Sequence, residues 1–451
     1  MKILKPIGIV LLWLAGCLFV TLALHKNDPV LLALRGLGNI ALCAVSLLVV
    51  AILSWRGYWR AKWAGRLLVL LWILPSLAML GEMVALEACK RSVLHTDSAR
   101  AQKLGQHFLI GYRSFPEVAR LADKGLIGGI YVTKHNIAGR SMEEVRAEIA
   151  ALQARRLSAH LPPLIVAADQ EGGIVSHLSP PLPALPPLSA LAALSPDLRE
   201  RAAEEFGRVH GRSLSELGVN LNFAPVLDLR PARGRNRFDI NTLIEQRAIS
   251  ADPAIVADIA RAYAHGLETF GVSATVKHFP GLGRVRGDTH LFNASLDASV
   301  ADLEASDWRP FKEVLAGSHA QLMIGHVNLT AIDPDRPASH SKAVIDGLIR
   351  KQWKFDGLII TDDLVMGAVY GRNICTAVVE ALNAGADLLL VAFDSDQFYR
   401  IFACASEAAA QNRLDSKMLR ESDARLKARF GNPRAPSTST PEPADARRAG
   451  E

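Results

Sequence analysis

Three long apolar runs near the N-terminus constrain the fold more than any other feature of the sequence. Residues 6–24 carry no charge, and residues 37–55 contain one polar amide, Asn39. Residues 67–86 are charged only at Glu82, near the far end of the run. A helix rising 1.5 Å per residue crosses the ~30 Å hydrocarbon core of a bilayer in about 20 residues. We therefore expect three transmembrane helices, at about residues 6–24, 37–55 and 67–86.

Basic residues in the short loops predict how these helices are oriented. Lys2 and Lys5 precede the first run, and the loop after the second run is basic at Arg56, Arg60, Lys62 and Arg66. Such clusters stay on the cytoplasmic side of a membrane. Two intervening spans put both clusters on that side, so a third span places the rest of the chain outside. We expect a multi-pass protein of the inner (cytoplasmic) membrane, whose larger part faces the periplasm or cell exterior. The alternative for the first run is a cleaved signal peptide.

The charge of the chain is concentrated in the same region. The first 100 residues hold eleven Lys and Arg against four Asp and Glu, whereas the remaining 351 hold 40 against 41. A nucleic-acid-binding protein places its basic surplus on the folded domain, so nucleic acid is excluded as a partner. Half the residues are hydrophobic, which excludes general disorder. The five Cys fit neither a disulfide scaffold nor a zinc motif, and we expect them to be small, buried apolar side chains.

From about residue 101 short β-rich runs alternate with helical stretches. The strand-like runs are residues 108–111, 129–133, 164–168, 221–226, 274–277, 321–324, 358–361 and 387–391. The helical stretches include residues 142–156, 198–217, 253–270 and 301–315. Eight such units predict a (β/α)₈ TIM-type barrel over residues 96–430, after a membrane region of residues 1–95. An open doubly wound sheet is the alternative, but no GxGxxG follows a strand. Residues 431–451, rich in Pro, Ser, Thr and charge, predict a disordered tail.

Polar residues gather where the predicted strands end. Asp169 and Glu171 follow the third strand, Asn222 and Asp228 bracket the fourth, Lys277 and His278 end the fifth, His326 follows the sixth, and Asp362 and Asp363 follow the seventh. The carboxyl ends of barrel strands form one rim, which is the active-site face. Core packing does not explain so many polar strand ends in succession, and they predict a catalytic site on this rim.

Two of these strand ends carry the residues best suited to chemistry. Residues 357–368 deliver two carboxylates directly from a buried strand. Asp362 lies nearer the strand and is a candidate nucleophile, whereas Asp363 is better placed to cap the next helix or orient a neighbour. Residues 276–290 form a glycine-rich loop that ends in Asp288 and His290. An Asp bonded to one imidazole nitrogen makes the other nitrogen a stronger base, so this pair predicts a general acid/base.

These stretches resemble glycoside hydrolase family 3, and in particular its β-N-acetylglucosaminidase branch. KHFPGLG at residues 277–283, four further residues and then Asp-Thr-His at 288–290 keep the spacing of that branch. The other matching motifs are DQEGG at 169–173, NFAPVLD at 222–228, EQRAI at 245–249, PAS at 337–339 and ITDDLVMGA at 360–368. The resemblance runs in unbroken order from about residue 103 to 429. The first 95 residues have no counterpart in it.

The resemblance implies a role for each matching residue. Asp362 is implied to be the nucleophile that forms a glycosyl-enzyme, with His290 as acid/base and Asp288 as its partner. The residues implied to bind the sugar are Asp169, Arg247, Lys277 and His278. The implied activity is that of a retaining exo-β-N-acetylglucosaminidase that trims GlcNAc-terminated glycans such as cell-wall (peptidoglycan) fragments. No metal or organic cofactor is indicated, and the oligomeric state is open.

The sequence departs from the family at several places near the site. Leu282 replaces the second His of the family's KHFPGHG motif, and Ile174 and His177 replace two Arg. These changes leave the natural aglycone and linkage open. They also keep two alternatives in view: a family 3 phosphorylase or glycosidase of other sugar specificity, and a non-catalytic membrane-bound glycan-binding protein. A structural role is also open for Lys277, as a buried ion pair perhaps with Asp169, and for His326.

Overall fold

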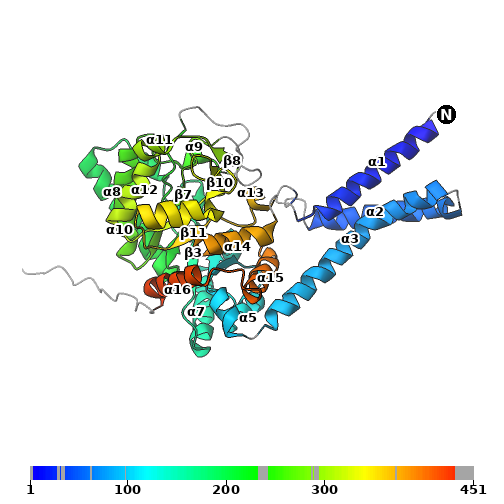
Figure 1. Ribbon diagram of the computed structural model, residues 1–451, viewed down its shortest axis with the longest axis horizontal. Coiled ribbons are helices and arrows are strands. Elements are labelled where there is room, and N and C mark those ends of the chain that lie inside the picture. The colour runs from blue at the N-terminus through cyan, green and yellow to red at the C-terminus, as the bar shows by residue number, and fades with distance from the viewer. Residues whose placement is uncertain are drawn as a thin grey trace, which may run out of the picture.

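The computed structural model of the chain describes residues 4–27, 31, 36–60, 63–96, 98–231, 242–285, 288, 294–370 and 373–431. Three apolar helices lead into an eight-stranded parallel barrel wrapped by helices (Figure 1). The tail expected at residues 431–451 lies, apart from its first residue, outside the described residues.

The three apolar helices agree with the three predicted runs. They are α1 (Leu4–Leu24), α2 (Leu37–Trp55) and α3 (Trp63–Leu94). Each is long and apolar enough to cross a membrane. The third differs from the prediction, because it continues past residue 86 to Leu94 as one helix of 32 residues. Its last turns leave the apolar bundle and pack against the barrel.

α3 is the central helix of this bundle. Its Trp72 indole donates a hydrogen bond to the carbonyl of Leu12 in α1 over 3.1 Å, and its ring lies 5.1 Å from that of Phe19. Large apolar side chains on the outside remain open, with Leu14 62% and Leu48 60% exposed. So much contiguous apolar surface is unusual for a soluble protein, whereas a bilayer would cover it.

The barrel confirms the predicted fold class. Its strands are β1 (Phe108–Gly111), β2 (Gly129–Val132), β3 (Ile165–Ala168), β6 (Leu221–Asn222), β7 (Ser273–Phe279), β9 (Gln321–Ile324), β11 (Ile359–Thr361) and β12 (Leu389–Val391). They pair in parallel and in chain order, and β12 returns to β1. A bridge between Ile360 and Leu388 closes the ring. This result excludes the open sheet, since an open sheet leaves two unpaired edges.

Side chains fill the barrel interior and its outer layer separately. An inner cluster that includes Leu109, Phe223 and Ile360 occupies the centre, and a larger cluster lies between strands and helices. This division follows from the alternation of side chains along each strand. The expected strand at 221–226 is regular only at residues 221–222, with an isolated bridge at Val226, and Pro225 between them has no N–H to donate.

Helices cover the barrel between successive strands. The longer ones are α5 (Phe115–Asp123), α7 (Met142–Ser158), α8 (Pro196–Leu217), α10 (Pro253–Glu268), α12 (Trp308–Gly317), η5 (Ala343–Gln352), α14 (Ile374–Ala384), α15 (Gln397–Ala410) and α16 (Ser416–Phe430). The shorter ones include α4 (Ala99–Gly105), α6 (Lys134–Ile137), α9 (Ile244–Arg247), α11 (Val300–Ala305) and α13 (Gly367–Tyr370). The prediction of one helix over 301–315 is wrong. The chain breaks at Ser306, whose hydroxyl bonds back to Asp302, and a new helix begins at Trp308.

Two short pairs of strands lie outside the barrel, and the sequence did not predict them. β4 (Gln170–Gly172) and β5 (Val175–Ser176) form a hairpin directly after β3, and β8 (Ala294–Leu296) pairs with β10 (Val327–Leu329). Both follow the carboxyl ends of barrel strands, so they build up the rim.

One cysteine expectation is corrected. Cys375 of α14 and Cys404 of α15 form a disulfide with Cα atoms 5.1 Å apart, rather than two separate buried thiols. Cys17, Cys43 and Cys89 are unpaired. The 29 residues that separate the bonded pair hid it from sequence reasoning, because only the packing of α14 on α15 brings them together.

Candidate active site

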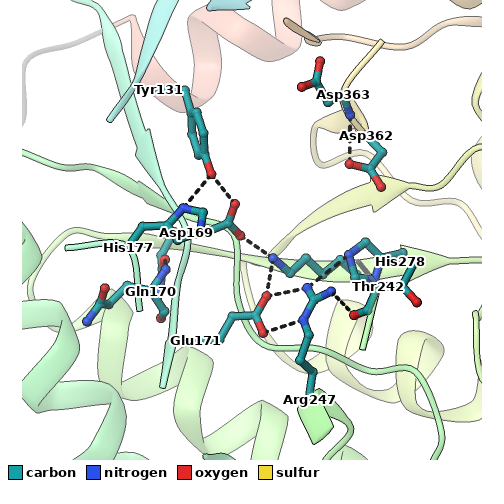
Figure 2. Close-up of polar contacts among 12 residues, drawn as sticks. Tyr131, Asp169, Gln170, Glu171, His177, Thr242, Arg247, His278, Asp362 and Asp363 are labelled. Atoms are coloured by element: carbon teal, nitrogen blue, oxygen red, sulfur yellow. Dashed lines mark hydrogen bonds and ion pairs between the residues drawn. The ribbon is translucent and has the colours of Figure 1, made fainter. Parts of the chain in front are cut away.

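The structure brings the predicted sugar-binding residues together at the carboxyl rim of the barrel. Asp169 follows β3, Lys277 and His278 end β7, and Arg247 ends α9. Figure 2 shows Asp169, Arg247 and His278 on one side of the site and Asp362 on the other, with its carboxylate turned towards the space between them. The strands determine this arrangement, since parallel barrel strands end at one rim.

A buried cluster of two carboxylates and two cations forms the floor of the site. Glu171 contacts the Lys277 ammonium at 2.7 Å and the Arg247 guanidinium at 2.6 and 3.0 Å. Lys277 also pairs with Asp169. The side chains of Lys277, Glu171 and Arg247 are no more than 9% exposed. Two negative and two positive charges balance, so the cluster is neutral when all four are ionised.

Local strand geometry explains why Asp169 and Glu171 act together. Residues two apart on an extended strand point to the same side, and the residue between them points to the other. Asp169 and Glu171 accordingly reach Lys277 together. Gln170 points away, where its amide donates to the Ser179 hydroxyl and accepts from the Leu178 backbone amide.

Opposite charges outweigh the effect of burial on these groups. Burial alone would raise the pKa values of Asp169 and Glu171, but Lys277 beside Asp169 and Arg247 beside Glu171 hold both below the usual range. Burial likewise opposes the charge of Lys277, but the two carboxylates raise its pKa above the usual value. All four groups are therefore ionised at neutral pH, and their donors and acceptors are fixed in direction.

The carboxylate of Asp228, which follows the fourth predicted strand, orients His278. Its Nδ1 lies 2.7 Å from Asp228, which is fully buried. The same carboxylate accepts the backbone amide of Leu282 over 2.6 Å. The Nε2 of His278 lies 3.4 Å from the Arg247 guanidinium. Asp228 thus fixes both the imidazole and the start of the following loop.

The two carboxylates after β11 differ as their positions in the sequence suggested. Asp362 is partly exposed at the strand end, and its Oδ1 accepts the Asp363 backbone amide over 2.8 Å. Asp363 is buried and accepts amides from Val365, Ala392 and Phe393 at 3.1, 3.2 and 2.8 Å. Burial raises the pKa of Asp363 to about 6, against the opposing effect of those amides. Asp363 therefore ties the loop after β11 to the loop after β12.

His326 has a structural position behind Asp363. Its Nδ1 lies 2.7 Å from the Ser339 hydroxyl, and its Nε2 lies 3.0 Å from the Asp363 carbonyl. Both ring nitrogens are thus engaged by the scaffold, which favours the structural role over that of a pocket-lining residue.

The predicted acid/base pair is described only at its first member. Asp288 is fully buried, and His290 lies outside the described residues. The start of their loop is held in place. The Trp308 indole donates to the Pro280 carbonyl over 3.1 Å, and Arg284 pairs with Asp307 at 2.7 Å.

The departures from the family pattern fall into two kinds. Leu282 is buried at 6% exposure and packs into the core. His177 instead joins the site, because its Nδ1 lies 3.1 Å from the Tyr131 hydroxyl, which donates to Asp169 over 2.5 Å. Burial lowers the pKa of His177, so this ring is neutral where the family has a cation. Ile174 is 49% exposed at the turn between β4 and β5.

Sequence reasoning missed two residues of the site, Glu171 of the floor and Tyr131 beside it. Glu171 was noted after the third strand but was not counted among the sugar-binding residues, although it contacts both cations. The i, i+2 spacing from Asp169 was the available signal. Tyr131 gave no signal, because an aromatic residue in a strand is usually core. Among the residues that the structure describes, no group of three or more His, Cys, Asp or Glu could hold a metal ion.

Comparison with known proteins agrees with this geometry. The model of the glycosyl hydrolase family 3 N-terminal domain matches residues 100–427. The chain is similar to the β-hexosaminidase of Nitrosomonas eutropha, with 34% identity over 277 residues, 60% of this chain and 75% of that protein. It is similar to the β-hexosaminidase of Xylella fastidiosa strain 9a5c, with 36% identity over 282 residues, 62% of this chain and 79% of that protein.

Solved structures of this family also resemble the chain. A family 3 β-N-acetylglucosaminidase from Paenibacillus sp. FPU-7 aligns with a TM-score of 0.67 at 30% identity, over 73% of this chain and 62% of its own. A β-N-acetylhexosaminidase from Beutenbergia cavernae aligns with a TM-score of 0.65 at 27% identity, over 74% of this chain and 99% of its own. The chain therefore belongs to glycosyl hydrolase family 3 and is a glycoside hydrolase, with β-hexosaminidase activity supported by its relatives.

Proposed function

We propose that the protein is a retaining exo-β-N-acetylglucosaminidase that removes terminal GlcNAc from glycans, cell-wall fragments among them. One observation carries the proposal: the Asp362 carboxylate faces the floor of the site (Figure 2). That floor is made of four ionised side chains whose charges sum to zero: Asp169, Glu171, Lys277 and Arg247. This arrangement offers fixed donors and acceptors to sugar hydroxyls on one side and a carboxylate to the anomeric carbon on the other.

The floor suits an uncharged, hydroxyl-rich ligand. An ammonium has three N–H donors, and Asp169 and Glu171 take two of those of Lys277. The remaining donor can reach a sugar hydroxyl or an acetamido carbonyl. The carboxylate of Asp169 can accept further hydroxyls besides that of Tyr131. Because the charges of the floor are already compensated, a neutral sugar binds without uncovering an unpaired charge.

The proposed reaction has two steps. In the first, Asp362 attacks the anomeric carbon, the bond to the leaving oxygen breaks, and His290 gives its proton to that oxygen. In the second, neutral His290 takes a proton from water, which attacks the same carbon and releases GlcNAc and the free Asp362 carboxylate. Asp288 is proposed to hold the imidazole in the tautomer that both steps need. Two inversions at one carbon retain the β configuration.

The test is hydrolysis of an aryl β-N-acetylglucosaminide by the detergent-solubilised full chain. We expect turnover with β-GlcNAc as the first product, and a loss on the order of 10³-fold or more for Asp362→Ala. Asp258→Asn, an exposed carboxylate on α10, is the matched control. A 5-fluoro-GlcNAc substrate should label the peptide that contains Asp362. Labelling elsewhere, or near-normal turnover by Asp362→Ala, contradicts the assignment, and GlcNAc 1-phosphate formed in phosphate buffer would indicate phosphorolysis.

We further propose that residues 1–95 anchor the enzyme in the inner membrane by three passes, with the barrel of residues 96–430 in the periplasm or outside the cell. The start of α1 and the turn between α2 and α3 both lie at the end of the bundle away from the barrel (Figure 1). That turn carries Arg56 and Arg60, and Arg66 lies in the first turn of α3, which favours the cytoplasmic side. The disulfide between α14 and α15 favours an oxidising compartment for the barrel.

Protease added to spheroplasts tests this topology. We expect the barrel to be degraded without lysis, whereas a cytoplasmic marker survives. Survival of the barrel until the cells are lysed would place it in the cytoplasm and overturn the proposed orientation.

A further inference from the structure

The barrel is joined to the apolar bundle by a continuous helix rather than by a loop. α3 leaves the bundle and lies along α15, where Glu82 pairs with Arg400 at 2.6 Å. Two turns later, Lys90 lies between Glu117 at 3.2 Å and Asp396 at 2.7 Å. Its ammonium also stands 5.1 Å from the centre of the Tyr399 ring. These contacts fix the direction of the barrel relative to the bundle.

The helices that hold α3 begin at the rim of the active site. Glu117 lies in the first turn of α5, which follows β1, and Asp396 immediately precedes α15, which follows β12. In a βα unit the helix starts where the strand ends, so both residues lie at the level of the carboxyl rim. α3 then continues to Leu94, and α4 leads into the amino end of β1. After the rim contacts of Lys90, α3 and α4 therefore run towards the opposite end of the barrel.

A second contact places the start of α2 at the same rim. Gly36, at the start of α2, lines a cavity of about 460 Å³ together with Tyr112 and Arg113 after β1 and Phe393 and Asp394 after β12. Figure 1 agrees: α13, which follows β11, lies on the side of the barrel nearest the bundle, and α16 lies away from it. The site thus opens towards the end of the bundle from which α3 emerges.

The height of the rim above the apolar part of the bundle follows from the helix. Glu82 is the first charged residue of α3 after Arg66, and Lys90 comes eight residues later. At 1.5 Å per residue, this is about 12 Å. The rim contacts of Lys90 therefore lie about 12 Å along α3 beyond Glu82, which is within reach of a sugar carried on a lipid headgroup.

We propose that the substrate is a glycan attached to a lipid of the same membrane, from which the enzyme removes a terminal β-linked GlcNAc. The inference rests on the proposed glycosidase activity and membrane anchoring, and narrows the substrate to a class. The bond between the anomeric carbon and the glycosidic oxygen breaks, water supplies OH to the sugar and H to that oxygen, and the shortened lipid stays in the membrane. A lipid confined to the bilayer presents its sugar at the height and in the direction that the rim requires.

Proteoliposomes of the full chain test the proposal. The probe is β-GlcNAc joined by a short ethylene-glycol spacer to a dialkylglycerol, placed either in the same vesicles as the enzyme or in separate ones. We expect hydrolysis to be at least about tenfold faster when probe and enzyme share a vesicle, because a shared membrane raises the effective concentration of the probe near the enzyme. A water-soluble aryl β-N-acetylglucosaminide is assayed in the same samples. Equal rates in the two arrangements, with the aryl substrate turned over, would overturn the proposal, whereas no aryl turnover would instead refute the underlying activity.

Changing the height of the barrel gives an independent test. Seven alanine-rich helical residues inserted between Gly81 and Glu82 raise it by about 10 Å and turn it by about 700°, close to two full turns. We expect aryl turnover to persist, the same-vesicle rate on the short probe to fall at least about tenfold, and a probe with a spacer longer by about 10 Å to restore it. The same insertion between Phe430 and Gly431 is the control. An unchanged rate on the short probe would contradict the inference.

A milder variant applies if the insertion prevents folding. Arg400→Ala removes the pair with Glu82 and leaves the catalytic and sugar-binding residues untouched. We expect it to reduce the ratio of the probe's hydrolysis rate in shared vesicles to that in separate vesicles several-fold, without affecting turnover of the aryl substrate. Arg309→Ala, which removes an exposed pair with Glu313 on α12, should change neither. Equal behaviour of the two variants would count against a fixed orientation of the rim.

Discussion

Glu171→Gln is the most informative single change in the site, because it keeps the shape of the side chain and removes its charge. Glu171 contacts Arg247 through both oxygens, at 2.6 and 3.0 Å, and Lys277 at 2.7 Å. Gln keeps one acceptor oxygen but turns an NH₂ towards a cation. The net charge of the four-residue floor changes from zero to +1, in a site where these side chains are almost fully buried.

The magnitude follows from the cost of an unpaired buried charge. Removing one partner of a buried ion pair typically costs about 3–5 kcal/mol. The pair of Lys277 with Asp169 remains, so we expect a loss near the lower end, about 3 kcal/mol. Lys277 and Arg247 also lose the anchor that directs their donors, and we expect kcat/KM on the aryl substrate to fall at least about tenfold, equivalent to about 1.4 kcal/mol of transition-state stabilisation.

Two assays measure these effects. Urea unfolding of the detergent-solubilised chain, followed by tryptophan fluorescence, gives the free energy of unfolding, and steady-state kinetics give kcat and KM. Glu204→Gln is the matched control, because Glu204 pairs with Arg208 at 2.7 Å on the surface of α8, where such pairs contribute about 0.5 kcal/mol or less. A loss of stability no larger than that of the control, together with unchanged kinetics, would refute the reasoning.

Three further predictions concern pH, the disulfide and the loop behind Asp362. Because the folded-state pKa values of Asp169 and Glu171 lie below those of the unfolded chain, their contribution to stability is present above about pH 5 and is lost as the pH falls through 4 and below. When the free energy of unfolding is measured at decreasing pH, it should therefore fall less steeply in Glu171→Gln than in the unchanged protein. Replacing Cys375 and Cys404 by Ser opens a loop of 29 residues, and the free energy of unfolding should drop by about 3.5 kcal/mol in urea, whereas an unchanged value would argue against the bond. Asp363→Ala removes the acceptor of two backbone amides after β12, so kcat should fall at least about tenfold with a smaller change in KM. A change in KM alone would mean that Asp363 positions the sugar rather than Asp362.

Local patterns predicted most of the barrel. Each of the eight predicted strand runs overlaps a barrel strand, because a short apolar β-rich run between helical stretches is a local signal. The errors came where side chains from elsewhere intervene. The helix over 301–315 breaks beside Asp307, which Arg284 of the loop after β7 contacts at 2.7 Å, and that contact has no local signature.

The candidate site was predictable as a list of residues but not as a network. Strand ends predicted Asp169, Lys277, His278 and Asp362 at one rim, and the structure places them there. The pairing of Glu171 with both cations was not predictable, since Arg247 lies 76 residues away along the chain. Likewise, Asp228 was known only as a polar residue beside the fourth strand until its contact with His278 appeared.

The sequence by itself determined the three apolar helices, the order of the strands and the residue types at the rim, because hydrophobic periodicity and strand-end position are properties of short segments. Only the tertiary structure decided which carboxylate compensates which cation and which way the rim faces. Those features depend on contacts such as that of Glu82 with Arg400, which are 318 residues apart. Such contacts form only after the barrel has closed and α3 has packed against it, and no short window of sequence contains both partners.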